Sequence, residues 1–227
     1  FKRDNNLNYT TEQIVTSTGA KQSLANVCLS LLNPGDEVLL PCPYWVSYAE
    51  IIKLAEGIPI KVTTKIDNDF KVNAEELEAV ITPKTKLLMF SSPCNPSGTV
   101  YTKKELEKIA RMLEKYPDIY IISDEIYEHI NFTNEHHSMG SIKSMEDRTI
   151  TVNGVSKGYA MTGWRVGFIG APLWIAKACN KIQGQITSAT CAIAQKAVET
   201  AMLANPKEVT TDMKSTFQKR RNMILKE

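Results

Sequence analysis

Short apolar runs alternate with helical patterns along the chain, and this alternation restricts the possible folds more than any other feature. Most of the runs lack the polar–apolar alternation that is typical of a strand with one solvent-exposed face. They cover residues 13–19, 36–43, 57–64, 86–93, 118–124, 148–154 and 165–171. Continuous apolar runs are typical of strands buried on both faces of a parallel sheet. We therefore predict a three-layer α/β/α fold around a mainly parallel sheet of about seven strands.

Helix-start signals lie between the predicted strands. Asn73 and Thr102 each stand three residues before a glutamate, which is the spacing of a capping box. Another helical pattern begins at Ala20 and ends before Pro34. The chain after Pro172 reads as a long helical region.

Composition disfavours several classes of protein. The chain carries 27 basic and 25 acidic side chains, so no basic excess indicates a nucleic-acid or membrane partner. No stretch approaches the roughly 18 apolar residues of a membrane helix, and the first residues lack the apolar core of a signal peptide. The five cysteines are scattered, and the three histidines lack Cys or His partners at metal spacing. We expect a cytoplasmic protein with reduced thiols and no metal site.

Polar residues follow several predicted strands at their carboxyl ends, where doubly wound sheets bind ligands. Gly19, Ala20 and Lys21 open a helix directly after the first strand. Free N–H groups at such a helix start bind phosphate well, and small residues let the ligand approach the backbone. Asn95 follows the fourth strand in a Pro/Gly loop, and Asp124 ends the fifth strand.

Two aromatic residues accompany these groups. Trp45 follows the second strand and can offer a flat face to an aromatic ligand, and Tyr127 lies three residues after Asp124. Taken singly, each feature has an ordinary structural explanation as a turn, a helix cap, a salt bridge or a core aromatic. Only their combination at one sheet edge favours a ligand site.

Lys157 stands among small and uncharged residues after the sixth predicted strand. Ser156 precedes it, and the next charge toward the C-terminus is Arg165. An amine in a poorly solvated pocket near other cations has a lowered pKa and can attack a carbonyl to form a Schiff base. For a single lysine, a solvated surface position is the ordinary explanation.

One cofactor requires all of these groups together. Pyridoxal 5′-phosphate (PLP) offers an aldehyde to the amine, a phosphate to the helix start and the arginine, and a flat ring to the tryptophan. Its phenolic oxygen suits the amide and the tyrosine. Its pyridine nitrogen suits the carboxylate, which keeps that nitrogen protonated so that the ring can act as an electron sink.

Two segments carry a family resemblance: SDEIYEH at 123–129 and NGVSKGYAMTGWRVG at 153–167. They resemble the signature segments of the class I/II aminotransferases, the PLP enzymes of fold type I. The S-K-x(7)-R-x-G spacing of lysine and arginine is the most specific element, and NPSG at 95–98 resembles the family's N-P-x-G loop. TGAKQ and PYWVSY are similar to the bacterial aspartate aminotransferase branch, some members of which also use prephenate.

The resemblance implies a role for each matching residue. Lys157 would form the Schiff base and then act as the acid and base of the 1,3-proton shift, with Asp124 and Tyr127 as its catalytic partners. The residues expected to hold the cofactor are Gly19, Ala20, Lys21, Trp45, Asn95, Asp124, Tyr127, Ser156, Lys157 and Arg165. The residues expected to contact substrate are Trp45, Asn95 and Lys21, the last through the distal carboxylate of an acidic substrate.

The resemblance also implies a domain organisation. Residues 1–227 would be a cofactor-binding large domain, without the N-terminal segment and the C-terminal small domain of the family. The small domain carries the arginine for the substrate α-carboxylate. Gly154 stands where many relatives have a Ser or Thr that contacts phosphate. Family members are usually dimers, so we expect a homodimer.

We therefore expect PLP-dependent transfer of an amino group between L-aspartate, or a similar acidic amino acid, and a 2-oxo acid such as 2-oxoglutarate. An aspartate/prephenate or aromatic aminotransferase and a PLP-dependent C–S lyase are alternatives, because one fold serves several reactions. A PLP-binding sensor domain of a regulator is the alternative that is not an enzyme. A nicotinamide-binding domain is disfavoured, because no G-x-G-x-x-G follows the first strand.

Overall fold

The predicted strands are all present and form one sheet. The computed structural model describes residues 1–133 and 135–226. Its strands are β1 (Ile14–Ser17), β2 (Glu37–Cys42), β3 (Ile58–Thr63), β4 (Thr85–Ser91), β5 (Tyr120–Asp124), β6 (Thr149–Gly154) and β7 (Gly167–Gly170). Their order in the seven-stranded sheet is β1-β7-β6-β5-β4-β2-β3. The pairs that β7 forms with β1 and β6 are antiparallel and the other four described pairs are parallel, so the prediction of a mainly parallel sheet is confirmed.

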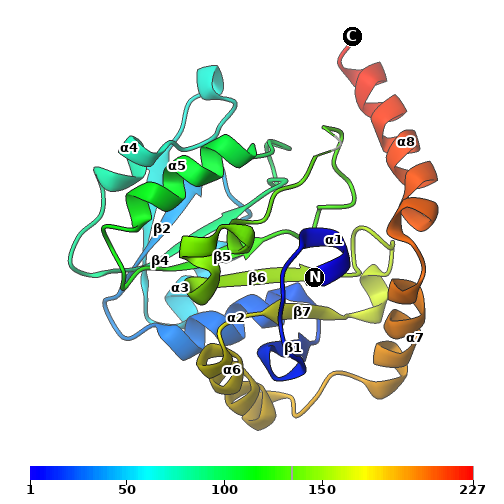
Figure 1. The fold of residues 1–227 in the computed structure, drawn as a ribbon, viewed down its shortest axis with the longest axis horizontal. Coiled ribbons are helices and arrows are strands. Elements are labelled where there is room, and N and C mark those ends of the chain that lie inside the picture. Colours follow the sequence, from blue (N-terminus) through cyan, green and yellow to red (C-terminus); the bar gives the residue numbers. More distant parts are fainter. Residues whose placement is uncertain (134, 227) are drawn as a thin grey trace.

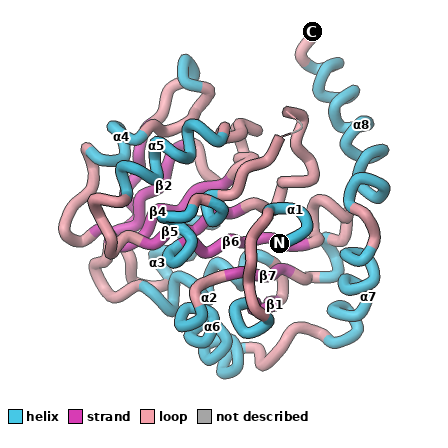
Figure 2. Tube along the Cα trace, viewed as in Figure 1, coloured by secondary structure: helices cyan, strands magenta, loops and turns pink. Residues whose placement is uncertain are grey.

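Helices cover both faces of this sheet and continue beyond it (Figure 1). The described α-helices are α1 (Lys2–Asn5), α2 (Ala20–Leu31), α3 (Ser47–Leu54), α4 (Ala74–Glu78), α5 (Lys103–Leu113), α6 (Leu173–Ile186), α7 (Ala192–Leu203) and α8 (Pro206–Ile224). Figure 2 shows that loops of varied length join these helices to the strands. No helix in the described part of the chain has both the length and the apolar character of a membrane span.

The two faces of the sheet have separate apolar cores. Along β4, Leu87 and Met89 pack into a core with α2, α3 and α6, whereas Leu88 and Phe90 pack into a core with α4 and α5. Figure 1 shows these two groups of helices on opposite sides of the strands. Successive side chains of a strand point to opposite faces of the sheet, and here each face packs against helices. Consecutive residues of such a strand must therefore both be apolar. This arrangement explains the continuous apolar runs and confirms the three-layer fold.

Both predicted capping boxes are present. Asn73 Oδ1 accepts a hydrogen bond from the Glu76 amide at 2.8 Å, at the start of α4. Thr102 Oγ1 accepts the corresponding bond from Glu105 at the start of α5. Each glutamate carboxylate in turn accepts a hydrogen bond from the backbone amide of the capping residue. The local sequence therefore fixes where these helices begin.

The region after Pro172 is helical, as predicted, but it is divided into three helices, α6, α7 and α8. Side chains at the first break bind the sheet: Gln183 Nε2 and Thr190 Oγ1 both donate to the Thr16 carbonyl of β1. Ser188 between them has a left-handed backbone, with φ of 61°. Pro206 begins α8, where its missing N–H costs nothing.

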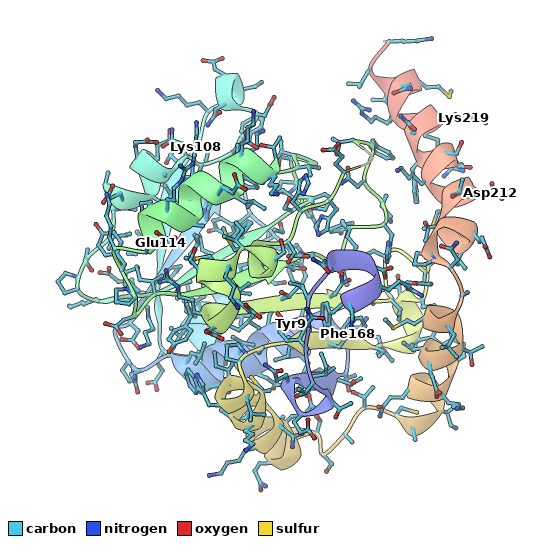
Figure 3. The ribbon with its side chains drawn as sticks, in the orientation of Figure 1. Tyr9, Lys108, Glu114, Phe168, Asp212 and Lys219 are labelled. Carbon is cyan, nitrogen blue, oxygen red and sulfur yellow. The ribbon has the colours of Figure 1, made fainter. Side chains whose placement is uncertain are left out.

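The segment before β1 crosses the outer part of the sheet. Tyr9 lies against Gly170 of β7, where an added Cβ would come within 2.3 Å of the Tyr9 ring. Phe1 makes edge contacts with Tyr9 and Phe168 at ring-centroid distances of 5.3 and 5.5 Å. Figure 3 labels Tyr9 and Phe168 side by side at this crossing.

Strand direction brings several chain ends to one edge of the sheet. Ser91 of β4 pairs with Asp124 of β5, so both strands end together. Gly167 pairs with Ser17 of β1 and with Gly154 of β6. Because β7 runs opposite to the other strands, it begins at the edge where they end. The residues just before β7 therefore lie beside the residues that follow β1 and β6.

Candidate active site

A cavity of about 240 Å³ opens at this carboxyl edge. It is lined by Ala20, Lys21, Trp45, Tyr48, Ser91, Asn95, Asp124, Ile126, Tyr127, Ser156, Lys157, Thr162 and Arg165. All of the predicted site residues except Gly19 are in this lining, and Gly19 lies directly behind Arg165. The structure therefore brings the predicted residues together in one place.

One end of the cavity is built around the start of α2. Gly19, with φ of 84°, is the residue before the helix, and an added Cβ would come within 2.2 Å of the Arg165 guanidinium. An added Cβ on Gly167 would come within 2.1 Å of the Ala20 nitrogen. Glycine at both positions lets the arginine and the helix start approach each other. The first N–H groups of a helix have no intrahelical acceptor, so this end can bind an anion such as phosphate.

Arg165 is held in place by its own loop. Its backbone is left-handed, with φ of 54°, and its Nη1 donates to the Thr162 carbonyl at 3.0 Å. The Thr162 hydroxyl donates in turn to the Ser156 carbonyl at 2.8 Å. The loop between β6 and β7 thus carries both Lys157 and Arg165, and Thr162 connects the Arg165 side chain to the backbone beside Lys157.

Asp124 lies in the floor of the cavity at the end of β5. Tyr48 donates its hydroxyl proton to Oδ2 at 2.6 Å, and the Ile126 amide donates to Oδ1 at 3.2 Å. Burial raises the pKa of Asp124 to about 6, although these two hydrogen bonds act in the opposite direction. A buried carboxylate of this kind suits a cationic nitrogen as its partner.

Asn95 and Tyr127 meet on the wall near Lys157. Asn95 Nδ2 donates to the Tyr127 hydroxyl at 3.4 Å. Lys157 Nζ lies 5.8 Å from the centroid of the Tyr127 ring. Burial raises the pKa of Tyr127, so its hydroxyl stays neutral near pH 7. An amide, a phenol and an amine therefore face the same space.

The charges around the cavity are unbalanced. Lys21, Lys157 and Arg165 line it, and among the described lining residues Asp124 alone carries a carboxylate. None of these three cations forms an ion pair with any residue that the structure describes. Lys21 Nζ instead lies 4.9 Å from the centroid of the Trp45 ring. The excess positive charge favours a ligand with more than one anionic group.

Sequence reasoning missed four residues of the lining, namely Tyr48, Ser91, Ile126 and Thr162. Ser91 ends β4, so the rule that located Asp124 at a strand end applies to it equally. Thr162 stands inside the signature segment between Lys157 and Arg165. Tyr48 has a weaker signal, which is its spacing of three residues from Trp45.

Comparison with known proteins gives a consistent family match. Residues 1–227 match the family model described as aminotransferase class I and II. The chain is 47% identical over 230 residues to a bifunctional aspartate aminotransferase and glutamate/aspartate-prephenate aminotransferase of Petunia hybrida, covering 100% of this chain and 48% of that protein. It is 44% identical over 227 residues to the aspartate/prephenate aminotransferase of Cereibacter sphaeroides, covering 99% and 56%.

Solved structures give the same result. The aspartate aminotransferase from Rhizobium meliloti superposes with a TM-score of 0.96 at 38% identity, over 99% of this chain and 56% of that one. The aspartate aminotransferase from Thermus thermophilus with maleate superposes with a TM-score of 0.92 at 38% identity, over 100% and 59%. The chain spans about half the length of the curated relatives it matches.

Proposed function

The chain belongs to the class I and II aminotransferases, and from this premise we propose that it transfers an amino group between L-aspartate, or a similar acidic amino acid, and a 2-oxo acid such as 2-oxoglutarate. The observation that carries the proposal is the convergence of Lys157, Asp124 and Arg165 on one cavity. In this proposal, residues 1–227 form the cofactor-binding large domain of a homodimeric enzyme.

The residues of the cavity fit PLP as its cofactor. The start of α2 and Arg165 match a phosphate, because glycine at position 19 leaves room for the guanidinium beside the helix. Asp124 matches a protonated ring nitrogen, because an ionised carboxylate accepts more than the two hydrogen bonds it already has. When bound, PLP supplies an aldehyde that an amine can attack and a ring that withdraws electrons from the substrate.

The chain's own residues then have separate tasks. Lys157 Nζ holds the cofactor and moves a proton at the substrate α-carbon, as a general acid and base. Asn95 and Tyr127, which lie together on the cavity wall, would donate hydrogen bonds to the phenolic oxygen. Trp45 lies where a flat ring can stack on it. Ser156 is buried and lines the cavity beside Lys157.

Lys21 is the residue that favours an acidic substrate. Its amine lies over Trp45 without an ion-pair partner in the described chain, at a place where it can meet a distal carboxylate. Relatives named aspartate aminotransferase support this choice. A second candidate is amino transfer to prephenate, which is favoured by the relatives named aspartate/prephenate aminotransferase.

The first test is covalent attachment of the cofactor. The chain is mixed with PLP, reduced with borohydride, and digested for mass spectrometry. We expect the added mass on the peptide that contains Lys157. Before reduction, the PLP-loaded chain should also show an absorption band in the near-ultraviolet or visible range. Lys157→Ala should lose both the added mass and the band. Lys181→Ala, an exposed lysine of α6, is the matched control and should retain both signals. Modification of another lysine in place of Lys157 would refute the proposed site.

The second test concerns the substrate. L-Aspartate added to the PLP-loaded protein should remove the bound-cofactor absorption band, and an aromatic amino acid should leave it unchanged. Lys21→Met should weaken the response to aspartate by about tenfold, because one charge-assisted hydrogen bond contributes roughly 1.5–3 kcal/mol. A response to the aromatic amino acid alone would overturn the choice of substrate.

A further inference from the structure

We propose that Tyr48 is a positioning residue that acts through Asp124: its hydroxyl group keeps the carboxylate turned toward the ring nitrogen of the cofactor and in its charged form. This inference rests on the proposed PLP site. It assigns a role to a residue that lies 76 positions before Asp124 and belongs to a different element, α3.

The contact is buried and directional. Tyr48 is 1% exposed and Asp124 is 4% exposed, yet both line the cavity. The phenol donates to Oδ2 at 2.6 Å, while the Ile126 amide donates to Oδ1 at 3.2 Å. Each oxygen therefore has a donor from a different part of the chain, which fixes the plane of the carboxylate. Further acceptor positions remain available for a ligand.

The chemistry of the pair favours a negative charge on Asp124. A hydroxyl that donates to a carboxylate stabilises the ionised form, which opposes the effect of burial. Burial, followed by the charge of Asp124, raises the pKa of Tyr48 well above its usual value, so the phenol stays neutral and remains a donor. Without this donor, the carboxyl of Asp124 would hold its proton to higher pH and would bind a cationic ring nitrogen less well.

The hydroxyl is separable from the packing of the ring. The Tyr48 ring belongs to the apolar core that α2, α3 and α6 form with the sheet. It meets the Trp45 ring edge-on, at a centroid distance of 5.6 Å. These contacts use the ring alone, so phenylalanine at position 48 would keep them. The segment from Trp45 to Tyr48 thus supplies two functions, a face for the cofactor ring and a donor for the carboxylate.

The test compares Tyr48→Phe with the unchanged chain, using PLP and its 1-deaza analogue, in which CH replaces the ring nitrogen. Dissociation constants are measured near pH 7 from the absorption of the bound ligand. We expect Tyr48→Phe to weaken PLP binding by about tenfold or more, since hydrogen bonds to charged groups are worth roughly 1.5–3 kcal/mol. Binding of the deaza analogue should change by less than about twofold, because it has no nitrogen to contact Asp124.

Tyr101→Phe is the matched control. Tyr101 is also buried, and its hydroxyl accepts a hydrogen bond from the Val72 amide in the other core. This variant should affect both ligands equally. Equal weakening of both ligands in Tyr48→Phe, or no weakening, would refute the role of Tyr48. Failure of the unchanged chain to bind PLP at Lys157 would instead refute the proposed function.

A second measurement uses Asp124→Asn as the background. If Tyr48 acts through the carboxylate, adding Tyr48→Phe to Asp124→Asn should change PLP affinity by less than about twofold. The pH profile gives an independent readout: PLP affinity of Tyr48→Phe should begin to fall at a higher pH than in the unchanged chain as the solution is acidified. Additive effects and coincident pH profiles would both contradict the proposal.

Discussion

At the scale of single residues, Asp124 makes the free energy of unfolding depend on pH. Burial raises its pKa from 3.8 to about 6, although Tyr48 and the Ile126 amide lower it. Between these two values the unfolded chain has lost the proton while the folded chain retains it. The contribution of Asp124 to stability is therefore present below 3.8 and is lost as pH rises through about 6. The difference amounts to about 3 kcal/mol.

Asp124→Asn should remove this dependence in the cofactor-free chain. At pH 7 we expect the variant to gain up to about 3 kcal/mol over the unchanged chain, with the gain disappearing near pH 4. Urea denaturation of both proteins from pH 4 to pH 8 measures the difference. Asp147→Asn, at an exposed position, serves as the control for the change of side chain itself. If the unchanged chain were as stable as Asp124→Asn at pH 7, burial of the Asp124 carboxylate would not outweigh its two hydrogen bonds.

The predictability of the site also varies residue by residue. Lys157 and Arg165, which line the cavity, were predictable as candidates because their spacing is rare and their chemistry is specific. Tyr48 was missed because its hydrogen bond to Asp124 joins two elements that are far apart in the sequence. Residues suited to contact a ligand directly can be recognised by residue type and spacing. Residues that position them through a hydrogen bond are recognised only when the structure shows that contact.

At the scale of elements, the start of β7 is interlocked with the start of α2. Gly167→Ala places a methyl group 2.1 Å from the Ala20 nitrogen, so the backbone must shift. We expect a loss of roughly 1–3 kcal/mol of stability and weaker binding of PLP, because the shift separates Arg165 from the helix start. Urea denaturation and a PLP titration measure the two effects.

Gly184→Ala is the matched control for this change. Gly184 lies within α6, and an added Cβ there meets nothing within 4 Å. Alanine should stabilise the helix by roughly 0.5–1 kcal/mol and leave the PLP titration unchanged. A Gly167→Ala protein that matches this control in both measurements would show that the close approach of β7 and α2 is dispensable.

The elements differ in how well the sequence predicts them. The strands were predictable because both faces of the sheet are covered, and α4 and α5 because their capping residues act locally. The break between α6 and α7 could not be predicted, because it depends on hydrogen bonds from Gln183 and Thr190 to β1. The reversed direction of β7 likewise follows from pairing with two distant strands.

At the scale of the whole molecule, the cavity joins segments that span most of the chain. Its walls come from the start of α2, the start of α3, the ends of β4 and β5, and the loop between β6 and β7. These elements share one sheet, and both apolar cores pack on it. A ligand that binds all of these segments is bound only by the folded chain, so its binding energy adds to the stability of the whole molecule.

PLP should therefore raise the melting temperature of the chain in one cooperative transition. At a hundredfold excess over its dissociation constant, a ligand contributes about 2.7 kcal/mol. For a chain of this size, that corresponds to a rise of roughly 5–11 °C. Differential scanning calorimetry measures the shift, and pyridoxal without phosphate, at the same concentration, should give a smaller rise because it cannot use Arg165 and the start of α2. A split transition, in which only part of the unfolding moves, would mean that the cavity segments do not unfold together with the sheet.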